Sequence, residues 1–270
     1  MRLRHEQQIK RGAEDGKSPS GVDEKGYSTK MNDKLVICIP GQWKDRDRLK
    51  RSVQKKSRSE YVLAEDLLMD TKHNRAFEVR FQEHEAKLSE SFYYSERGMM
   101  NDKALHKLDK HTHVLRLMSY MGGLDAVQKI VPAVQLLLKS GGLAVKIENS
   151  GKAYTSEEWD KLTREARVDQ LLHTFVSYRQ NEQYYYSCGM QMFGLPEAAI
   201  SIDTDPDASM QVMSQFLYGL LTQTEEESSA GKEFKIYGRT YASQYEPECF
   251  NEEEPYLYNP SGMYVLTEVG

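Results

Sequence analysis

The sequence has little of what marks several common protein classes. Its three cysteines, Cys38, Cys188 and Cys249, are widely spaced and form no C-x-x-C pair. This pattern argues against a disulfide framework or a zinc ribbon and is typical of a reducing compartment, so we expect a cytoplasmic protein. No apolar run approaches the ~20 residues of a membrane span, and the N-terminus has no apolar signal segment. We therefore expect no membrane association.

Nucleotide-binding motifs are also missing. Neither G-x-G-x-x-G nor G-x-x-x-x-G-K-[ST] occurs in the 270 residues. The glycines of those motifs let the backbone approach a phosphate closely. Because both motifs are absent, we expect neither a dinucleotide-binding site nor a P-loop. Ser187 has no G-x-S-x-G motif around it, which argues against a serine nucleophile of the hydrolase type. We expect no cofactor.

Charge is present but unevenly distributed. Residues 1–58 hold 16 Lys and Arg against 8 Asp and Glu, a net charge of +8. The whole chain has a net charge of −5, so residues 59–270 carry −13. A basic N-terminal part can attract nucleic acid or an acidic partner. Because no aromatic residues are interleaved with these charges, we expect a solvated tail and helix face, and nucleic-acid binding is the less favoured interpretation.

The chain divides by composition into a head and a folded body. Residues 1–30 are polar and lack apolar periodicity, which predicts a disordered basic head. Residues 31–270 are expected to form a single α+β domain, which can divide into two halves, 31–150 and 151–270. The spans 113–148 and 198–237 each run strand, helix, strand. The predicted fold is a mixed, largely antiparallel sheet with helices packed on it, with one β-α-β unit in each half.

Apolar periodicity and end signals locate the individual elements. A continuous apolar run predicts a central strand at 35–39, and period-two alternation predicts strands at 76–82 and 143–147. Thr155 and Glu158 form a capping-box pattern that starts a helix. Further strands are expected at 114–121, 198–203, 234–237 and 263–266. Further helices are expected after Asp45 or Asp47, near 85–97, over 125–138, from 155 to about 167, and from 206 onward.

Cys188 is the most conspicuous candidate nucleophile. Residues 172–179 and 184–193 can pair as a hairpin across a polar link, with Thr174 opposite Cys188 and His173 on the other face. In that register Cys188 lies on an apolar face, and no base can reach it. A buried thiol has a raised pKa and is inert, so we expect Cys188 to be a core residue.

The histidines offer one further constellation. His111 and His113 are two residues apart, so in an extended chain both imidazoles lie on one face and could bind a metal. The sequence contains no third ligand at a compatible spacing. The favoured interpretation is a polar strand entrance, and no metal is expected.

Aromatic residues near acidic ones suggest a binding surface. The segment "NEEEPYLYNPSG" places Tyr256 and Tyr258 beside three glutamates. Exposed aromatic side chains anchor protein interfaces, so Tyr256 and Tyr258 are the candidate partner-binding residues. The alternative is that both rings cover an open sheet edge.

Four stretches carry a resemblance to a known family. They are "Y-x-C-G-M-x-x-F-G-L-P-E" from Tyr186 to Glu197, "IPGQWKDRDRL", "GGLAVKIENSGKAYTSEEW" and "NPSGMYVL". Together, from about Leu35 to Leu266, they resemble an uncharacterised family of bacterial cytoplasmic proteins classed as a domain of unknown function. The resemblance implies no catalytic residues. Some members of that family occur in settings that suggest toxin–immunity or secretion clusters, which implies a partner-binding protein.

Two classes of function remain. The first is a non-enzymatic protein-binding protein, of which an immunity-type neutraliser of a toxin partner is one form. The second is a hydrolase-type enzyme whose site is assembled from distant residues, with His111, His113 or Cys188 as candidates. The lack of a catalytic motif, the 17 tyrosines and the acidic body favour the first.

Overall fold

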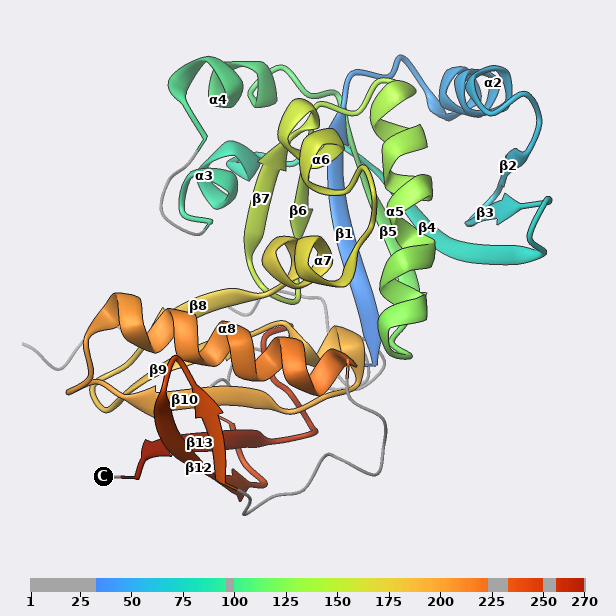
Figure 1. Ribbon diagram of the computed structural model, residues 1–270. Helices are drawn as coiled ribbons and strands as arrows, with labels where there is room; N and C mark the ends of the chain where they lie inside the picture. Colours follow the sequence, from blue (N-terminus) through green and yellow to red (C-terminus); the bar gives the residue numbers. More distant parts are fainter. Residues whose placement is uncertain (1–32, 96–99, 223–232, 250–255, 270) are drawn as a thin grey trace, which may run out of the picture.

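The computed structural model describes residues 33–95, 100–222, 233–249 and 256–269. The head predicted at residues 1–30 lies outside this part of the chain. Within it, seven helices and two mostly antiparallel sheets make an α+β protein, which confirms the predicted fold class. Figure 1 shows sheet A in the upper part of the view and sheet B in the lower part.

Sheet A has seven strands, and every pair of neighbours is antiparallel. Their spatial order is β2-β3-β4-β5-β1-β6-β7. The strands are β1 (Lys34–Gly41), β2 (Tyr61–Ala64), β3 (Leu67–Asp70), β4 (Arg75–Glu83), β5 (His113–Tyr120), β6 (Ala144–Ile147) and β7 (Lys152–Thr155). Strands β2 and β3 form a hairpin, because residues 65 and 66 turn the chain.

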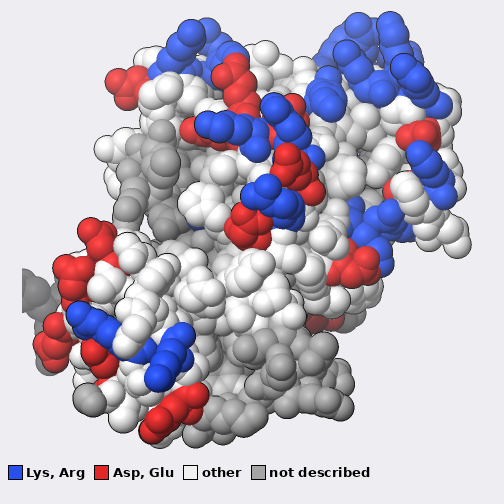
Figure 2. Space-filling view, viewed as in Figure 1, with Lys and Arg blue, Asp and Glu red and all other residues white. Residues whose placement is uncertain are grey.

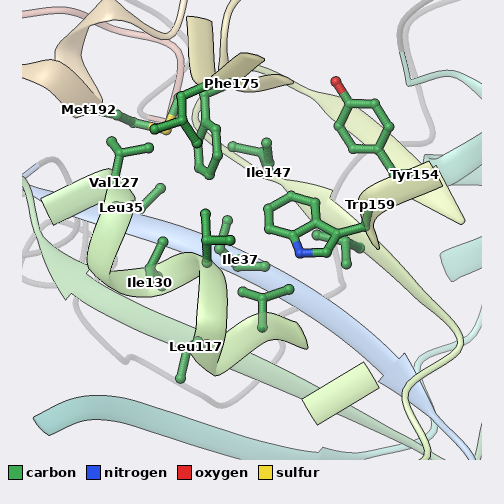
Figure 3. Close-up of a cluster of buried hydrophobic side chains, with 14 of the residues drawn as sticks. Leu35, Ile37, Leu117, Val127, Ile130, Ile147, Tyr154, Trp159, Phe175 and Met192 are labelled. Carbon is green, nitrogen blue, oxygen red and sulfur yellow. The ribbon is translucent and has the colours of Figure 1, made fainter. Parts of the chain in front are cut away.

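The apolar run at the start of the body becomes β1, an interior strand that lies between β5 and β6. Leu35, Ile37 and Ile39 of β1 face the main core, and Cys38 points to the other side of the sheet. Helix α5 (Leu124–Lys139) lies along the core-facing side (Figures 1 and 3) and buries Val127 and Ile130 there. Alternation along the strand thus gives sheet A two chemically different faces.

The helices α2, α3, α4, α6 and α7 divide between the two faces of sheet A. Helices α2 (Arg46–Lys56), α6 (Ser156–Leu162) and α7 (Val168–Phe175) contribute to the main core, whereas α3 (Leu88–Tyr93) and α4 (Asp102–Leu108) cover the Cys38 side. The capping box predicted for Thr155 and Glu158 is present. Helix α6 ends at Leu162, short of the predicted end near 167, and the helix predicted over 85–97 starts only at Leu88.

Sheet B has six strands in the order β11-β12-β13-β10-β9-β8. The strands are β8 (Ser177–Gln180), β9 (Tyr184–Cys188), β10 (Glu197–Ser201), β11 (Glu233–Ile236), β12 (Arg239–Glu246) and β13 (Met263–Glu268). The β10–β13 pair is parallel and the other pairs are antiparallel. A 3₁₀ turn, η2 (Met190–Phe193), lies in the connection between β9 and β10. Helix α8 (Pro206–Thr222) packs on the sheet (Figure 1).

Each sheet contains one crossover unit, as the order of predicted elements indicates. Strands β5 and β6 are both antiparallel to β1, which lies between them, so β5–α5–β6 is a split β-α-β unit. Strands β10 and β11 are also parallel to each other, with β13 and β12 between them, and α8 makes the connection. The largest group of buried side chains contains residues of both sheets, including Ile37 of sheet A and Ile200 of sheet B.

Candidate functional site

The structure confirms that Cys188 is buried but corrects the register that led to this prediction. Residues 168–175, predicted in part as strand, form helix α7. The hairpin therefore starts at Ser177, which pairs with Cys188, and Arg179 pairs with Tyr186. The β8–β9 pairing is thus shifted by three residues from the predicted one. The Cys188 side chain has no solvent exposure.

The polar residues near Cys188 form a closed network around a buried carboxylate. Glu197 Oε2 accepts a hydrogen bond from Ser187 Oγ at 2.6 Å. Its Oε1 accepts from Gly189 N at 3.0 Å, Met190 N at 2.8 Å and Asn259 Nδ2 at 3.0 Å. Burial raises the pKa of the Glu197 carboxyl, and these hydrogen bonds act in the opposite direction. Because Ser187 donates to Glu197 and accepts from Ala198 N, its hydroxyl is used structurally.

This network joins two of the stretches that carry the family resemblance. Glu197 ends "YSCGMQMFGLPE", and Asn259 begins "NPSGMYVL". Asn259 Nδ2 also donates to the backbone oxygen of Leu195 at 2.9 Å. The motif residues therefore fix the turn between β9 and β10 and the entry to β13, which is a structural role.

The histidines are held by backbone groups. His111 is buried; its Nδ1 lies 2.7 Å from the oxygen of Leu108, and its Nε2 accepts from the N–H of Glu85 at 3.2 Å. His113 Nδ1 lies 3.0 Å from the oxygen of Trp43, and its ring stacks on Phe81. Among the described residues, no group of three or more His, Cys, Asp or Glu side chains is arranged to hold a metal.

We expect the cysteines of the native protein to be unreactive. Cys38 and Cys188 are fully buried, Cys249 is nearly so, and none forms a disulfide. Burial raises the pKa of Cys38 to about 12, so its thiol stays protonated at neutral pH. A colorimetric thiol reagent at pH 7.5 should label no cysteine of the folded protein within minutes and all three in denaturant. Rapid labelling of Cys188 in the folded protein would instead support the enzyme alternative.

The most unusual arrangement of charge lies on the Cys38 side of sheet A. A row of directly paired residues crosses four strands there: Arg80 of β4, Arg116 of β5, Cys38 of β1 and Lys146 of β6. Two arginines side by side repel each other, and such pairs destabilise a sheet unless other groups compensate. We call this row, together with Glu148 and Tyr256, the charged face.

Carboxylates and an amide partly balance the cations of the charged face. Arg116 Nη2 lies 2.7 Å from Glu85 Oε2, and its Nη1 donates to Gln82. Lys146 Nζ lies 3.1 Å from Glu148 Oε2, and both of these side chains are largely buried. Arg80 is the most accessible cation of the row, with 39% of its side chain exposed. The face is therefore a polar layer that is partly open to solvent at Arg80.

Tyr256 borders the charged face. Burial raises the pKa of its phenol, the charge of Glu148 raises it further, and the charges of Arg116 and Arg80 lower it. Gln191 holds the backbone here, because its Nε2 donates to the oxygens of Asn149 and Tyr256 at 3.0 Å each. Tyr256 and Tyr258 are both half-buried. The structure thus places one of the two predicted partner-binding tyrosines beside basic side chains that the sequence analysis did not single out.

A signal for the charged face is present in the sequence. Arg116 interrupts the apolar stretch from Val114 to Met118, and Lys146 and Glu148 alternate with buried Val145 and Ile147. In a two-layer protein such polar positions usually face water. Only the strand order, which places β1 between β5 and β6, brings these positions into one row.

A separate hollow lies beyond the ends of the parallel strands β10 and β13. It has a volume of about 680 Å³, and its lining includes Tyr184, Asp203 and Glu268. The volume is in the range of small-molecule sites. The lining contains neither cysteine nor histidine, so it does not pair a thiol or an imidazole with another reactive group.

In the described part of the chain, no helix has the length and apolar character needed to cross a membrane.

Comparison with known proteins adds no relative. No protein-family model, curated protein or solved structure matches the chain. The family resemblance of the four motif stretches stays a prediction, and the function is argued from the charged face and the placement of the reactive side chains.

Proposed function

We propose that the protein is non-enzymatic and acts by binding another protein at the charged face. The observation that carries the proposal is the convergence of Arg80, Arg116 and Tyr256 on one partly open surface. Tyrosine and arginine are enriched among the residues that dominate interface energies, because each combines a large contact area with directional hydrogen bonding. A cytoplasmic location accompanies the proposal, because three free thiols suit a reducing compartment.

The local structure supports a binding role in two ways. Gln191 fixes the backbone of Tyr256, so little conformational freedom of this segment would be lost on binding. Arg80 pairs with Glu78 at 3.7 Å but keeps 39% of its side chain exposed, so an acceptor group on a partner could reach it. Cys188, Ser187 and His111, by contrast, are buried and have structural surroundings, which gives the enzyme alternative no comparable support.

The family resemblance adds a class of partner to the proposal. It implies an immunity-type role, in which the protein neutralises a toxin by binding it. A small, well-packed contact centred on Arg80 and Tyr256 suits such a role, since inhibitory complexes depend on a few anchoring side chains. Tyr258, two residues from Tyr256, is also half-buried.

The test is recovery of a protein partner from the native host. Tagged protein should recover a specific protein, and the double variant Arg80→Ala/Tyr256→Ala should lose it, with an expected fall in affinity of roughly 100-fold or more. Tyr237→Ala is the matched control, because Tyr237 is 73% exposed in the β11–β12 turn, away from the charged face.

Two results would contradict the proposal. One is that no protein is recovered by the wild-type chain. The other is that the same protein is recovered equally by the double variant and by the control. Thermal unfolding of each variant, followed by circular dichroism, establishes that a lost interaction does not come from a lost fold.

A further inference from the structure

A second charged surface lies on the opposite side of sheet A, on helix α2. Only Leu49 and Val53 of this helix are buried, so most of its circumference faces solvent. Residues 44–58 contain eight Lys and Arg and two Asp. Figure 2 shows the basic side chains gathered over α2, at the upper right of the view.

Three of these cations line up along the helix. Arg48, Arg51 and Lys55 are spaced i, i+3, i+7, which places them on one face over about 10 Å. All three are exposed. Arg46 pairs with Asp66 at 3.1 Å, but within the described part of the chain no ion pair engages Arg48, Arg51 or Lys55. We call these three residues the basic stripe.

The basic stripe is not needed to form the helix. Asp45 caps the N-terminus by accepting the N–H of Arg48 at 2.7 Å, and Leu49 and Val53 anchor α2 in the core. Arg51 and Lys55 are a like-charge i, i+4 pair, which opposes helix formation. The side chains that stabilise α2 and those that form the stripe are therefore separate sets. A stripe of exposed cations on a firmly anchored helix suggests a recognition surface.

The surroundings of the stripe distinguish between two kinds of anionic partner. Asp47 of α2 and Asp66, which pairs with Arg46, are both exposed, and these acidic groups interrupt the continuous basic surface that suits a phosphate backbone. The nearest tyrosine in sequence, Tyr61, is buried and offers no ring for base stacking. A protein surface can match a stripe of one sign and a rim of the other, because it carries both kinds of charge.

We propose that the basic stripe docks an acidic segment of a partner protein. Arginine suits this contact, because its planar guanidinium can bind a carboxylate through two parallel hydrogen bonds. The inference rests on the proposed protein-binding function and adds a second surface with its own partner chemistry. The two surfaces lie on opposite sides of sheet A, since Val53 belongs to the main core and Cys38 to the other cluster.

The test uses a fluorescent peptide of alternating glutamate and serine and measures its fluorescence polarisation with the purified full-length chain. The variant R48Q/R51Q/K55Q removes the basic stripe. The control K103Q/K107Q/K110Q removes the same charge from exposed positions on and beside α4. We expect the stripe variant to bind the peptide about tenfold more weakly and the control to change affinity less than twofold, because each exposed ion pair contributes modestly.

Other outcomes would overturn the inference. Equal weakening by the two triple variants would mean that only net charge matters. If the wild-type chain did not bind the peptide, the basic stripe would not be a docking surface for acidic segments. Tighter binding of a 20-base-pair DNA duplex than of the peptide, abolished in the stripe variant, would identify a nucleic-acid surface instead.

Failure here can be separated from failure of the proposed function. The Arg80→Ala/Tyr256→Ala variant should bind the acidic peptide like the wild type, because its substitutions lie across the sheet from α2. If peptide binding fails while recovery of the partner still depends on Arg80 and Tyr256, only the basic stripe is refuted. If the peptide binds through the stripe but no partner is recovered, the charged face is refuted.

Discussion

Replacement of Glu197 by alanine is expected to lower the free energy of unfolding by roughly 4 kcal/mol or more. The substitution removes the acceptor for four donors, the Ser187 hydroxyl, the Asn259 amide and two backbone N–H groups, all in a fully buried place. Each buried donor left without a partner costs about 1–3 kcal/mol. Urea unfolding followed by tryptophan fluorescence measures the change, since Trp43 and Trp159 are both in the core.

Glu197→Gln is the matched comparison. The glutamine carbonyl oxygen can still accept from Gly189 N, Met190 N and Asn259, so three of the four hydrogen bonds can persist. Only the contact of Oε2 with Ser187 changes in kind, and we expect a loss of about 1 kcal/mol. If the alanine variant were as stable as the glutamine variant, the carboxylate would not hold the network together.

Replacement of Gly41 by alanine is expected to destabilise the protein by about 1–3 kcal/mol through overpacking. A Cβ at this position would lie 2.3 Å from Cη2 of Trp43, far inside normal contact distance. The indole cannot move aside easily, because its Nε1 donates to the oxygen of Ser140 at 2.8 Å and its ring also lies against Gly141. The measurement is the midpoint of urea unfolding.

Two further variants separate the contact from a general effect of alanine. Gly122→Ala should change stability little, because its nearest neighbour would be Ala126 Cβ at 3.8 Å. In a Trp43→Leu background, Gly41→Ala should cost much less than in the wild type, because the ring that it meets is gone. Equal costs in the two backgrounds would mean that the Gly41–Trp43 contact is not the cause.

The elements that were predicted correctly have local signals. The run from Leu35 to Ile39 is apolar and β-branched, and it became an interior strand of sheet A because only a strand with both faces covered can bury every residue. The Thr155–Glu158 capping box, which consists of contacts within one turn, formed as predicted. Such signals are readable because the interacting residues lie three or four positions apart.

The errors occur where tertiary contacts override local preference. In "LHTFVSYR" the β-branched and aromatic residues favour a strand, yet residues 168–175 are helical and bury Leu171, Leu172 and Phe175 in the core. Strand β12 was not predicted, because its residues are mostly polar and its pairing with β13 supplies the order that its composition lacks. Strand β7 was not predicted either, because a strand of only four residues is too short to show a clear apolar alternation.

The candidate site was only partly predictable for a related reason. Tyr256 was identified from its composition and neighbours, but the basic side chains beside it come from three strands that are distant in sequence. Their meeting depends on the order of strands in sheet A, which no local pattern specifies. The burial of Cys188 was predicted from a register that proved wrong; the residue lies instead in a small buried cluster with Tyr186, Ala199 and Met263.

The position of β13 in the middle of sheet B has a consequence for synthesis of the protein. Strand β13 pairs with β10 on one side and β12 on the other, so it alone joins the two parts of that sheet. Sheet A is complete once residue 155 has been made, but sheet B stays in two pieces until residues 263–268 leave the ribosome. During translation, β10 and β12 each expose an unpaired edge, and such edges invite pairing with other nascent chains. Chaperones that shield strand edges should therefore matter most until residues 263–268 have been made.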